Sequence, residues 1–235
     1  MKVRIKFSKS GSMIFIGHLD MMRYFQKAMR RADVDISYSG GFSPHQIMSF
    51  AAPLGVGLYS NGEYMDIGVD SLTSASQLKD ALNRVMVEGV EILSVKLLPE
   101  TAGNAMASVA AALYTVSFRH GYEPDFDLFG QIDDYLDQNE IIVQKETKKG
   151  TKELDLKPHI YSFTYDRNQM TCQLMLDASS AGNIKPVLVM EDLYRFCGRK
   201  ADEFTFVITR EDTYARADGE NEDCFVPLDA LGEDY

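Results

Sequence analysis

The residues of this sequence best suited to chemistry lie between His18 and Phe50. Two histidines, His18 and His45, can each donate or accept a proton near neutral pH. His18 begins a helical pattern, where free backbone N–H groups and the helix dipole favour an anion. His45 ends a loop that starts with Gly40-Gly41, and glycines permit a positive φ or a close approach to backbone. The two rings would allow metal-independent RNA cleavage, although Asp20 can simply cap the helix while His18 packs in the loop.

The same segment holds residue types that bind RNA. The spacing of four basic residues places most of them on one solvent-facing side of the predicted helix, which suits phosphate groups. The ring of Phe42 can stack on an unpaired base. An ordinary solvated helix face and a phenylalanine that plugs the core are the structural alternatives. The candidate RNA-binding residues on these grounds are His18, Asp20, Arg23, Lys27, Arg30, Arg31, Phe42 and His45.

Charge is distributed unevenly along the chain. The 235 residues carry a formal net charge of −11, which argues against a general nucleic-acid coat protein. Residues 1–39 nevertheless hold eight basic and three acidic side chains, whereas residues 218–235 hold seven acids and no base. The polarity therefore favours an RNA surface near the N-terminus and an acidic, disordered tail over residues 217–235.

Other classes of protein are disfavoured by what the sequence lacks. No apolar run approaches the roughly 18 residues of a membrane span, and Met1 leads directly into a strand pattern rather than a signal peptide. The cysteines Cys172, Cys197 and Cys224 are too scattered for a disulfide framework, which fits the cytoplasm. With His120 and His159 they match no compact zinc pattern. We therefore expect a cytoplasmic protein with neither metal nor cofactor.

The elements that must position these residues recur in two halves. Hydrophobic periodicity predicts strands at 2–8, 36–39, 63–69 and 90–98, and helices at 18–32 and 74–87. The apolar stripe of the first helix is predicted to be Leu19, Met22, Phe25, Met29 and Ala32. After a connector at 99–104, strands follow at 112–118, 141–145, 160–165, 170–176 and 204–209, with helices at 126–137 and 184–196.

The order of these elements predicts an α+β fold. Each half fits the ferredoxin-like βαββαβ arrangement, with an antiparallel sheet and helices on one face, and the second half carries one extra strand. We therefore expect tandem ferredoxin-like domains over residues 1–99, which carry the candidate site, and residues 100–216.

The chain resembles the uncharacterised family of radical SAM-linked proteins over residues 1–215. The motifs that carry the resemblance are FSKSG, FIGHLDMMRYFQKAMRRA, YSGGFSPHQIMSFAAPLGVG, GEYMDI, KELDLKPHI, NIKPVLVMEDLY and VITREDTYA. The resemblance adds Ser39, Gly41, Pro44 and Glu63 to the candidate RNA-binding residues, and Ser43 joins them as a residue of the same loop. The family loop reads roughly GFNPHPK, so Ser43, Gln46 and Ile47 depart from it, and the loop here lacks the basic residue.

The resemblance implies a partner protein more than a particular enzymatic reaction. Members are encoded beside, or fused to, cobalamin-type radical SAM proteins, so a radical SAM enzyme encoded nearby is the expected partner. This chain cannot itself hold such a cluster, because three closely spaced cysteine ligands are missing. A looser similarity in fold relates it to CRISPR repeat-processing endoribonucleases. Three functions follow as hypotheses: an RNA-binding module serving the partner enzyme, a docking subunit without RNA contact, and an endoribonuclease using His18 and His45.

Overall fold

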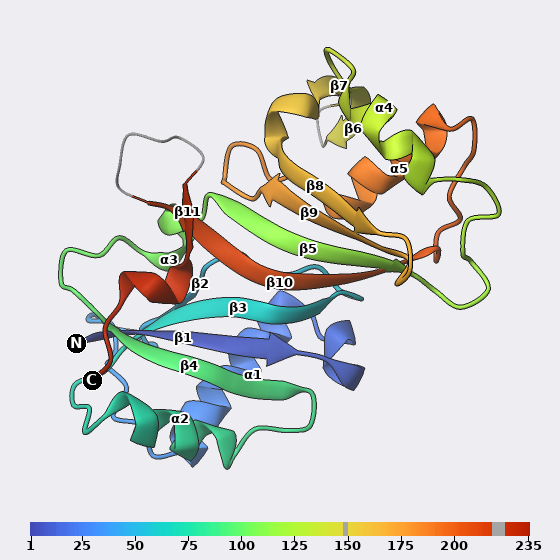
Figure 1. Cartoon of the computed structure of the whole chain (residues 1–235). Coiled ribbons are helices and arrows are strands. Elements are labelled where there is room, and N and C mark those ends of the chain that lie inside the picture. The colour runs from blue at the N-terminus through green and yellow to red at the C-terminus, as the bar shows by residue number, and fades with distance from the viewer. Residues whose placement is uncertain (148–149, 218–223) are drawn as a thin grey trace. The chain divides into compact units, whose positions relative to one another are not determined.

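The computed structural model describes residues 1–147, 150–217 and 224–235, with no side-chain description for 145–147 (Figure 1). The chain divides into two compact units: unit 1 is Met1–Ala111 with Arg210–Tyr235, and unit 2 is Ala112–Thr209. The fold is α+β, with mostly antiparallel strands and few helices. The division differs from the expected boundary near residue 99, because strand β10 (Phe206–Arg216) contributes its residues from Arg210 onward to unit 1.

Unit 1 is built on a sheet of strands from both ends of the chain. Its strands are β1 (Lys2–Lys9), β2 (Met48–Phe50), β3 (Tyr59–Gly68), β4 (Val90–Leu98) and β11 (Phe225–Pro227), together with part of β10. Strand β1 pairs antiparallel with both β3 and β4, and β2 pairs antiparallel with β3. Helices α1 (His18–Arg31) and α2 (Ala75–Asn83) lie on the same side of the strands, and a short α3 spans Ala105–Ser108 (Figure 1).

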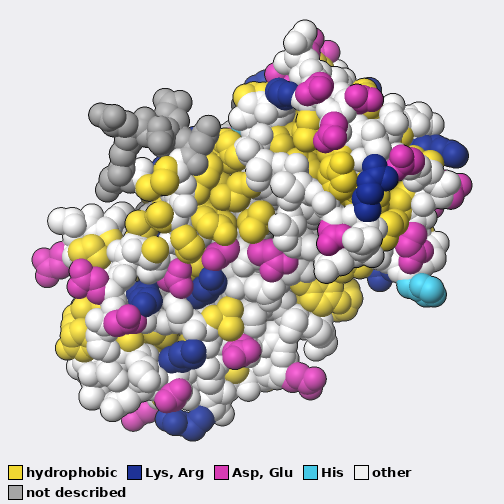
Figure 2. All heavy atoms as spheres, viewed as in Figure 1, with side chains coloured by type: hydrophobic (Ala, Val, Ile, Leu, Met, Phe, Trp, Pro, Cys, Tyr) yellow, Lys and Arg dark blue, Asp and Glu magenta, His cyan; other side chains and the backbone are white. Residues whose placement is uncertain are grey.

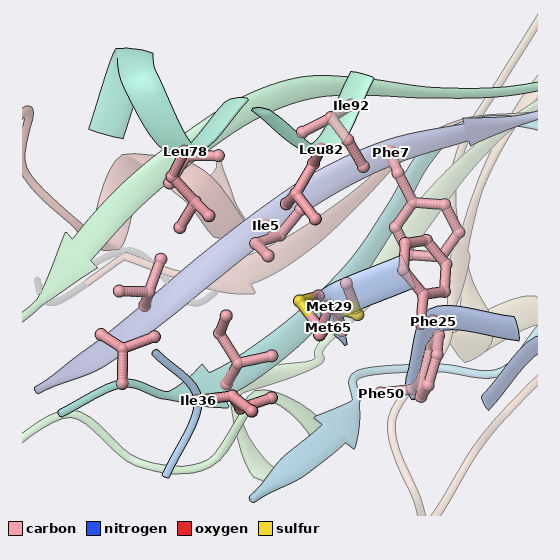
Figure 3. Packing of buried hydrophobic residues seen from close by; sticks show 14 of the residues in the cluster. Ile5, Phe7, Phe25, Met29, Ile36, Phe50, Met65, Leu78, Leu82 and Ile92 are labelled. Atoms are coloured by element: carbon pink, nitrogen blue, oxygen red, sulfur yellow. The ribbon is translucent and has the colours of Figure 1, made fainter. Parts of the chain in front are cut away.

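The core of unit 1 lies between the sheet and these helices (Figure 3). The alternate residues Val3, Ile5 and Phe7 of β1 face the helices, as the period of two predicts. Phe7, Phe25 and Phe50 meet edge to face, with ring centroids between 4.8 and 6.0 Å apart. These rings pack the middle of α1 against β1 and β2.

The opposite face of this sheet is also covered. Arg4 alternates with the apolar residues of β1, yet it is fully buried and makes a two-pronged ion pair with Asp66, with Nε–Oδ1 and Nη2–Oδ2 distances of 2.8 and 3.0 Å. Arg4 Nη1 also donates to the Leu228 carbonyl. The cover is the C-terminal segment of β11 and a 3₁₀ helix over Leu228–Leu231.

The C-terminal segment therefore differs from the expected disordered tail. Residues 218–223 of that tail lie outside the described residues, whereas residues 224–235 are ordered on unit 1. Leu228 is fully buried, Asp229 accepts from the hydroxyls of Tyr64 and Ser94, and Ala75 N donates to the Tyr235 carbonyl. The acidic composition is consistent with order here because these acids bind donors of the sheet rather than only water.

The predicted strand at residues 36–39 is replaced by β2 at Met48–Phe50. Residues 36 and 38 make only isolated bridges, from Ile36 to Val69 and from Tyr38 to Gln46. The intervening chain forms a hairpin that leaves the sheet, so the residues after it complete the pairing with β3.

Unit 2 contains β5 (Ala111–Phe118) from Ala112 onward, β8 (Ile160–Asp166), β9 (Thr171–Asp177) and the residues of β10 up to Thr209, in the order β10-β5-β9-β8. Helices α4 (Ile132–Leu136) and α5 (Pro186–Phe196) accompany them. Strands β6 (Ile142–Thr147) and β7 (Gly150–Asp155) form a separate two-stranded sheet. No helix in the described parts of the chain is long and apolar enough to cross a membrane.

Candidate RNA-binding surface

Helix α1 forms because its apolar residues recur at helical spacing and its last turn carries basic residues that match the helix dipole. Its buried side consists of Met21, Phe25, Ala28 and Met29 rather than the predicted stripe. Leu19 is 66% exposed. Phe25 and Met29 belong to both sets, so the observed buried side is rotated toward Met21 and Ala28.

The exposed side of α1 carries three cations that we call the cationic face: Arg23, Lys27 and Arg30. Their spacing of three and four residues makes them neighbours along the helix. Arg23 Nη1 lies 3.0 Å from Asp20 Oδ1, and both side chains are about 70% exposed. Within the described residues, Lys27 and Arg30 have no acidic or hydrogen-bonding partner. Arg31 faces a different neighbour, donating to the Val85 carbonyl and lying over the Tyr24 ring.

Beside this face stands a hairpin of residues 38–46, which we call the aromatic hairpin. Its neck is closed by Ser39 N donating to the His45 carbonyl (2.9 Å) and His45 N donating to Ser39 Oγ (3.1 Å). Ser39 Oγ and His45 Nδ1 lie 2.9 Å apart. Buried Gln46 ties the neck to α1 by donating from Nε2 to the Gln26 carbonyl (3.3 Å).

The tip of the aromatic hairpin is fully exposed. Gly41 has a φ of +98°, a conformation that favours glycine, and turns the chain so that the ring of Phe42 makes no contact with the core. Ser43 and Pro44 are exposed beside it. Of the two alternatives for Phe42, a core plug and a surface ring, the geometry gives the surface ring.

The other histidine, His18, has different surroundings. Its ring packs edge to face on Phe50 at a centroid distance of 5.2 Å. It lines a cavity of about 20 Å³ whose polar walls include Lys9 and Glu63. A cavity of this size admits a water-sized ligand but not a nucleotide base. No described contact joins His18 to His45, so the two rings of the hypothesised acid–base pair belong to separate groups.

Glu63 lies among buried charges rather than on the exposed surface. Its Oε1 lies 2.8 Å from Arg210 Nη1 and accepts a hydrogen bond from Ser60 Oγ. Lys9 is only 4% exposed and donates to the Ile16 carbonyl. Burial lowers the pKa of Lys9, Glu63 acts to raise it, and Arg210 lowers it further. Sequence reasoning did not find Lys9 and Arg210. Lys9 follows the alternation of the buried residues Val3, Ile5 and Phe7 but lies one residue beyond the predicted strand, and Arg210 is distant in the sequence.

Large exposed apolar residues were also missed. Phe15, Leu19 and Val56 are each more than half exposed. They lie on the 3₁₀ helix Gly11–Phe15, on α1 and on the loop before β3, and Gly57 N donates to the Ile14 carbonyl to join the first and last of these segments. Tyr38 is half exposed at the base of the aromatic hairpin.

On the side of unit 1 seen in Figure 2, basic and acidic side chains are intermingled. In unit 1, Lys6 pairs with Asp212 and Lys96 with Asp234, both at 2.6 Å. The cationic face differs because Lys27 and Arg30 lack such partners in the described chain.

Residues 2–186 match the model of a family described as "Uncharacterized protein conserved in bacteria (DUF2344)". A search of curated proteins finds no match.

Proposed function

The chain belongs to this bacterial family, and we propose that it is an RNA-binding accessory module that presents substrate RNA, for example tRNA, to a partner radical SAM enzyme. The observation that carries the RNA contact is the cationic face of α1 beside an aromatic ring held in solvent. The partner enzyme follows only from the resemblance described above. The residues assigned to RNA are Arg23, Lys27, Arg30 and Phe42.

Phosphate binding by the cationic face follows from its charge and exposure. The side chains of Lys27 and Arg30 form no ion pair within the described residues, so no ion pair has to break before they bind a phosphate. The exposed pair of Arg23 with Asp20 is worth about 0–1 kcal/mol, so a phosphate can compete for Arg23. Because the whole chain is acidic, with a net charge of −11, the remaining surface repels RNA and confines binding to this face.

The test is a fluorescence-anisotropy titration of labelled tRNA with wild type and with Lys27→Gln/Arg30→Gln. We expect the double variant to bind at least about tenfold more weakly, the equivalent of one charged hydrogen bond of roughly 1.4 kcal/mol. The slope of log K against log salt should fall by about 1.4, or about 0.7 for each single-strand phosphate contact.

The matched control is Lys185→Gln/Lys200→Gln, which removes two exposed lysines of unit 2 with the same change in net charge. It should leave tRNA affinity within about twofold of wild type. Equal losses in both double variants would mean that net charge alone sets the affinity. Absence of tRNA binding by wild type at low salt would retire the proposal.

The exposed apolar residues favour a second candidate, a docking subunit that contacts the partner enzyme without RNA. Exposed Phe15, Leu19 and Val56 are the kind of residues that protein interfaces cover. In this case the radical SAM enzyme encoded nearby would be retained by wild type and released by Phe15→Ser/Leu19→Ser, while tRNA would not bind. The endoribonuclease hypothesis draws no support from the separate surroundings of His18 and His45.

We also propose a tandem ferredoxin-like fold. The antiparallel order β4-β1-β3-β2 of unit 1 and the order β10-β5-β9-β8 of unit 2 support it, since the two orders correspond when each unit is read along the chain.

A further inference from the structure

The aromatic hairpin leaves its ring in solvent, so the ring contributes no burial energy to the stability of the fold. Burying a phenylalanine is worth about 1.5–3 kcal/mol, yet Phe42 lies wholly in solvent. The neck below the ring is held in place, because hydrogen bonds join Ser39 to His45 and Tyr38 bridges to Gln46.

The hairpin also stands at a defined place on α1. Gln46 Nε2 reaches the carbonyl of Gln26, and Gln26 adjoins Lys27 and lies one turn from both Arg23 and Arg30. The neck of the aromatic hairpin is therefore bound to the stretch of helix that carries the cationic face.

We infer that Phe42 stacks on an unpaired base, so the RNA that this surface binds is single-stranded where it crosses the aromatic hairpin; this rests on the proposed RNA-binding function. An exposed ring can stack only on a base whose face is open, and in a duplex both faces are covered by neighbouring base pairs. The adjacent cations are suited to the phosphates of the same strand. Their presence favours a nucleic acid over an apolar protein segment as the occupant of the ring.

The size of the cavity beside His18 supports stacking on the surface over insertion into a pocket. A space of about 20 Å³ is too small for a base, so the cavity beside His18 offers no pocket for base insertion. The half-exposed Tyr38 at the foot of the hairpin offers a second ring for a neighbouring base.

The experiment measures the affinity of the full chain for a labelled twelve-nucleotide oligouridylate and for a twelve-base-pair RNA duplex at one low salt concentration. Phe42→Leu keeps an apolar side chain of similar size and no charge change, but it removes the ring. Loss of one stacked base should weaken oligouridylate binding about 5- to 150-fold and leave the salt slope unchanged. Phe42→Trp should bind within about twofold of wild type or more tightly.

A matched control is Phe15→Leu, which alters an exposed ring that is not part of the hairpin and should leave oligouridylate affinity unchanged. Unchanged affinity in Phe42→Leu, or duplex binding as tight as single-strand binding, would overturn the inference. If Phe42→Leu has no effect while Lys27→Gln/Arg30→Gln weakens binding, stacking is wrong and RNA binding stands. If wild type binds neither probe, both fail.

Discussion

The buried charges of unit 1 show how strongly single residues depend on their surroundings. Lys9 is almost wholly buried beside the His18 cavity, with the Ile16 carbonyl as its hydrogen-bond acceptor. Glu63 and Arg210 form an ion pair next to it, with both side chains less than 10% exposed. A buried lysine loses hydration, so its neutral form is favoured relative to water.

The variant Lys9→Met tests how burial of this lysine affects the stability of the protein. Because the pKa of Lys9 is lowered from 10.5 in the folded protein, the unfolded chain binds more protons between that lowered pKa and 10.5. Wild-type stability relative to Lys9→Met should therefore rise with pH through this window and fall as pH falls. Urea unfolding of wild type and Lys9→Met at pH 8 and pH 10 measures the difference between their free energies of unfolding. Contributions from titrating groups that the substitution does not affect cancel in this difference. A difference that stays constant with pH contradicts the prediction.

At the scale of elements, hydrophobic periodicity predicted the positions of the strands and helices better than it predicted which side of each is buried. Helix α1 contains apolar residues on two overlapping stripes that share Phe25 and Met29. The sequence favours the stripe through Leu19, whereas Met21 and Ala28 are the residues that the packing of unit 1 buries. Such a choice depends on residues of other elements, so a single helix pattern cannot make it.

Strand β3 depends on a glycine where it meets β10 in unit 1. A Cβ at Gly62 would lie 2.4 Å from Asp212 Cα, and Thr213 Oγ1 donates to the Gly62 carbonyl. Gly62→Ala should therefore destabilise the protein by about 1–3 kcal/mol, because backbone has to move. The control Gly40→Ala meets no atom within 4 Å and should change stability by less than about 0.5 kcal/mol. Thermal unfolding of the two variants checks this, and equal midpoints would contradict it.

For the whole molecule, the exposed side of α1 was more predictable than the covering of the sheet. Basic residues three and four apart predicted the cationic face, whereas the sequence left open whether Phe42 lies on the surface or in the core. Burial of Arg4 could not be foreseen, since its acceptor carbonyl belongs to Leu228, far along the sequence. The same long-range contact explains why an acidic composition was a poor guide to order in residues 224–235.

Truncation after Ala217 tests the structural role of the C-terminal segment. Removing residues 218–235 uncovers Arg4 and takes away the Asp229 acceptor of Tyr64 and Ser94, so the unfolding midpoint of the protein should fall clearly. The point variant Leu228→Ala, which leaves the acids in place, should cost about 2–5 kcal/mol because Leu228 is fully buried.

Measuring the stability of the truncated chain at two salt concentrations separates the effect of lost packing from the effect of the changed net charge. The truncation also removes seven acids from a chain of net charge −11, which relieves repulsion and would by itself stabilise the compact state. At about 1 M salt the Debye length is about 3 Å and this relief is screened, so the loss of stability should be larger than at low salt. An unchanged midpoint at both salt concentrations would mean that residues 224–235 cover the sheet without stabilising it.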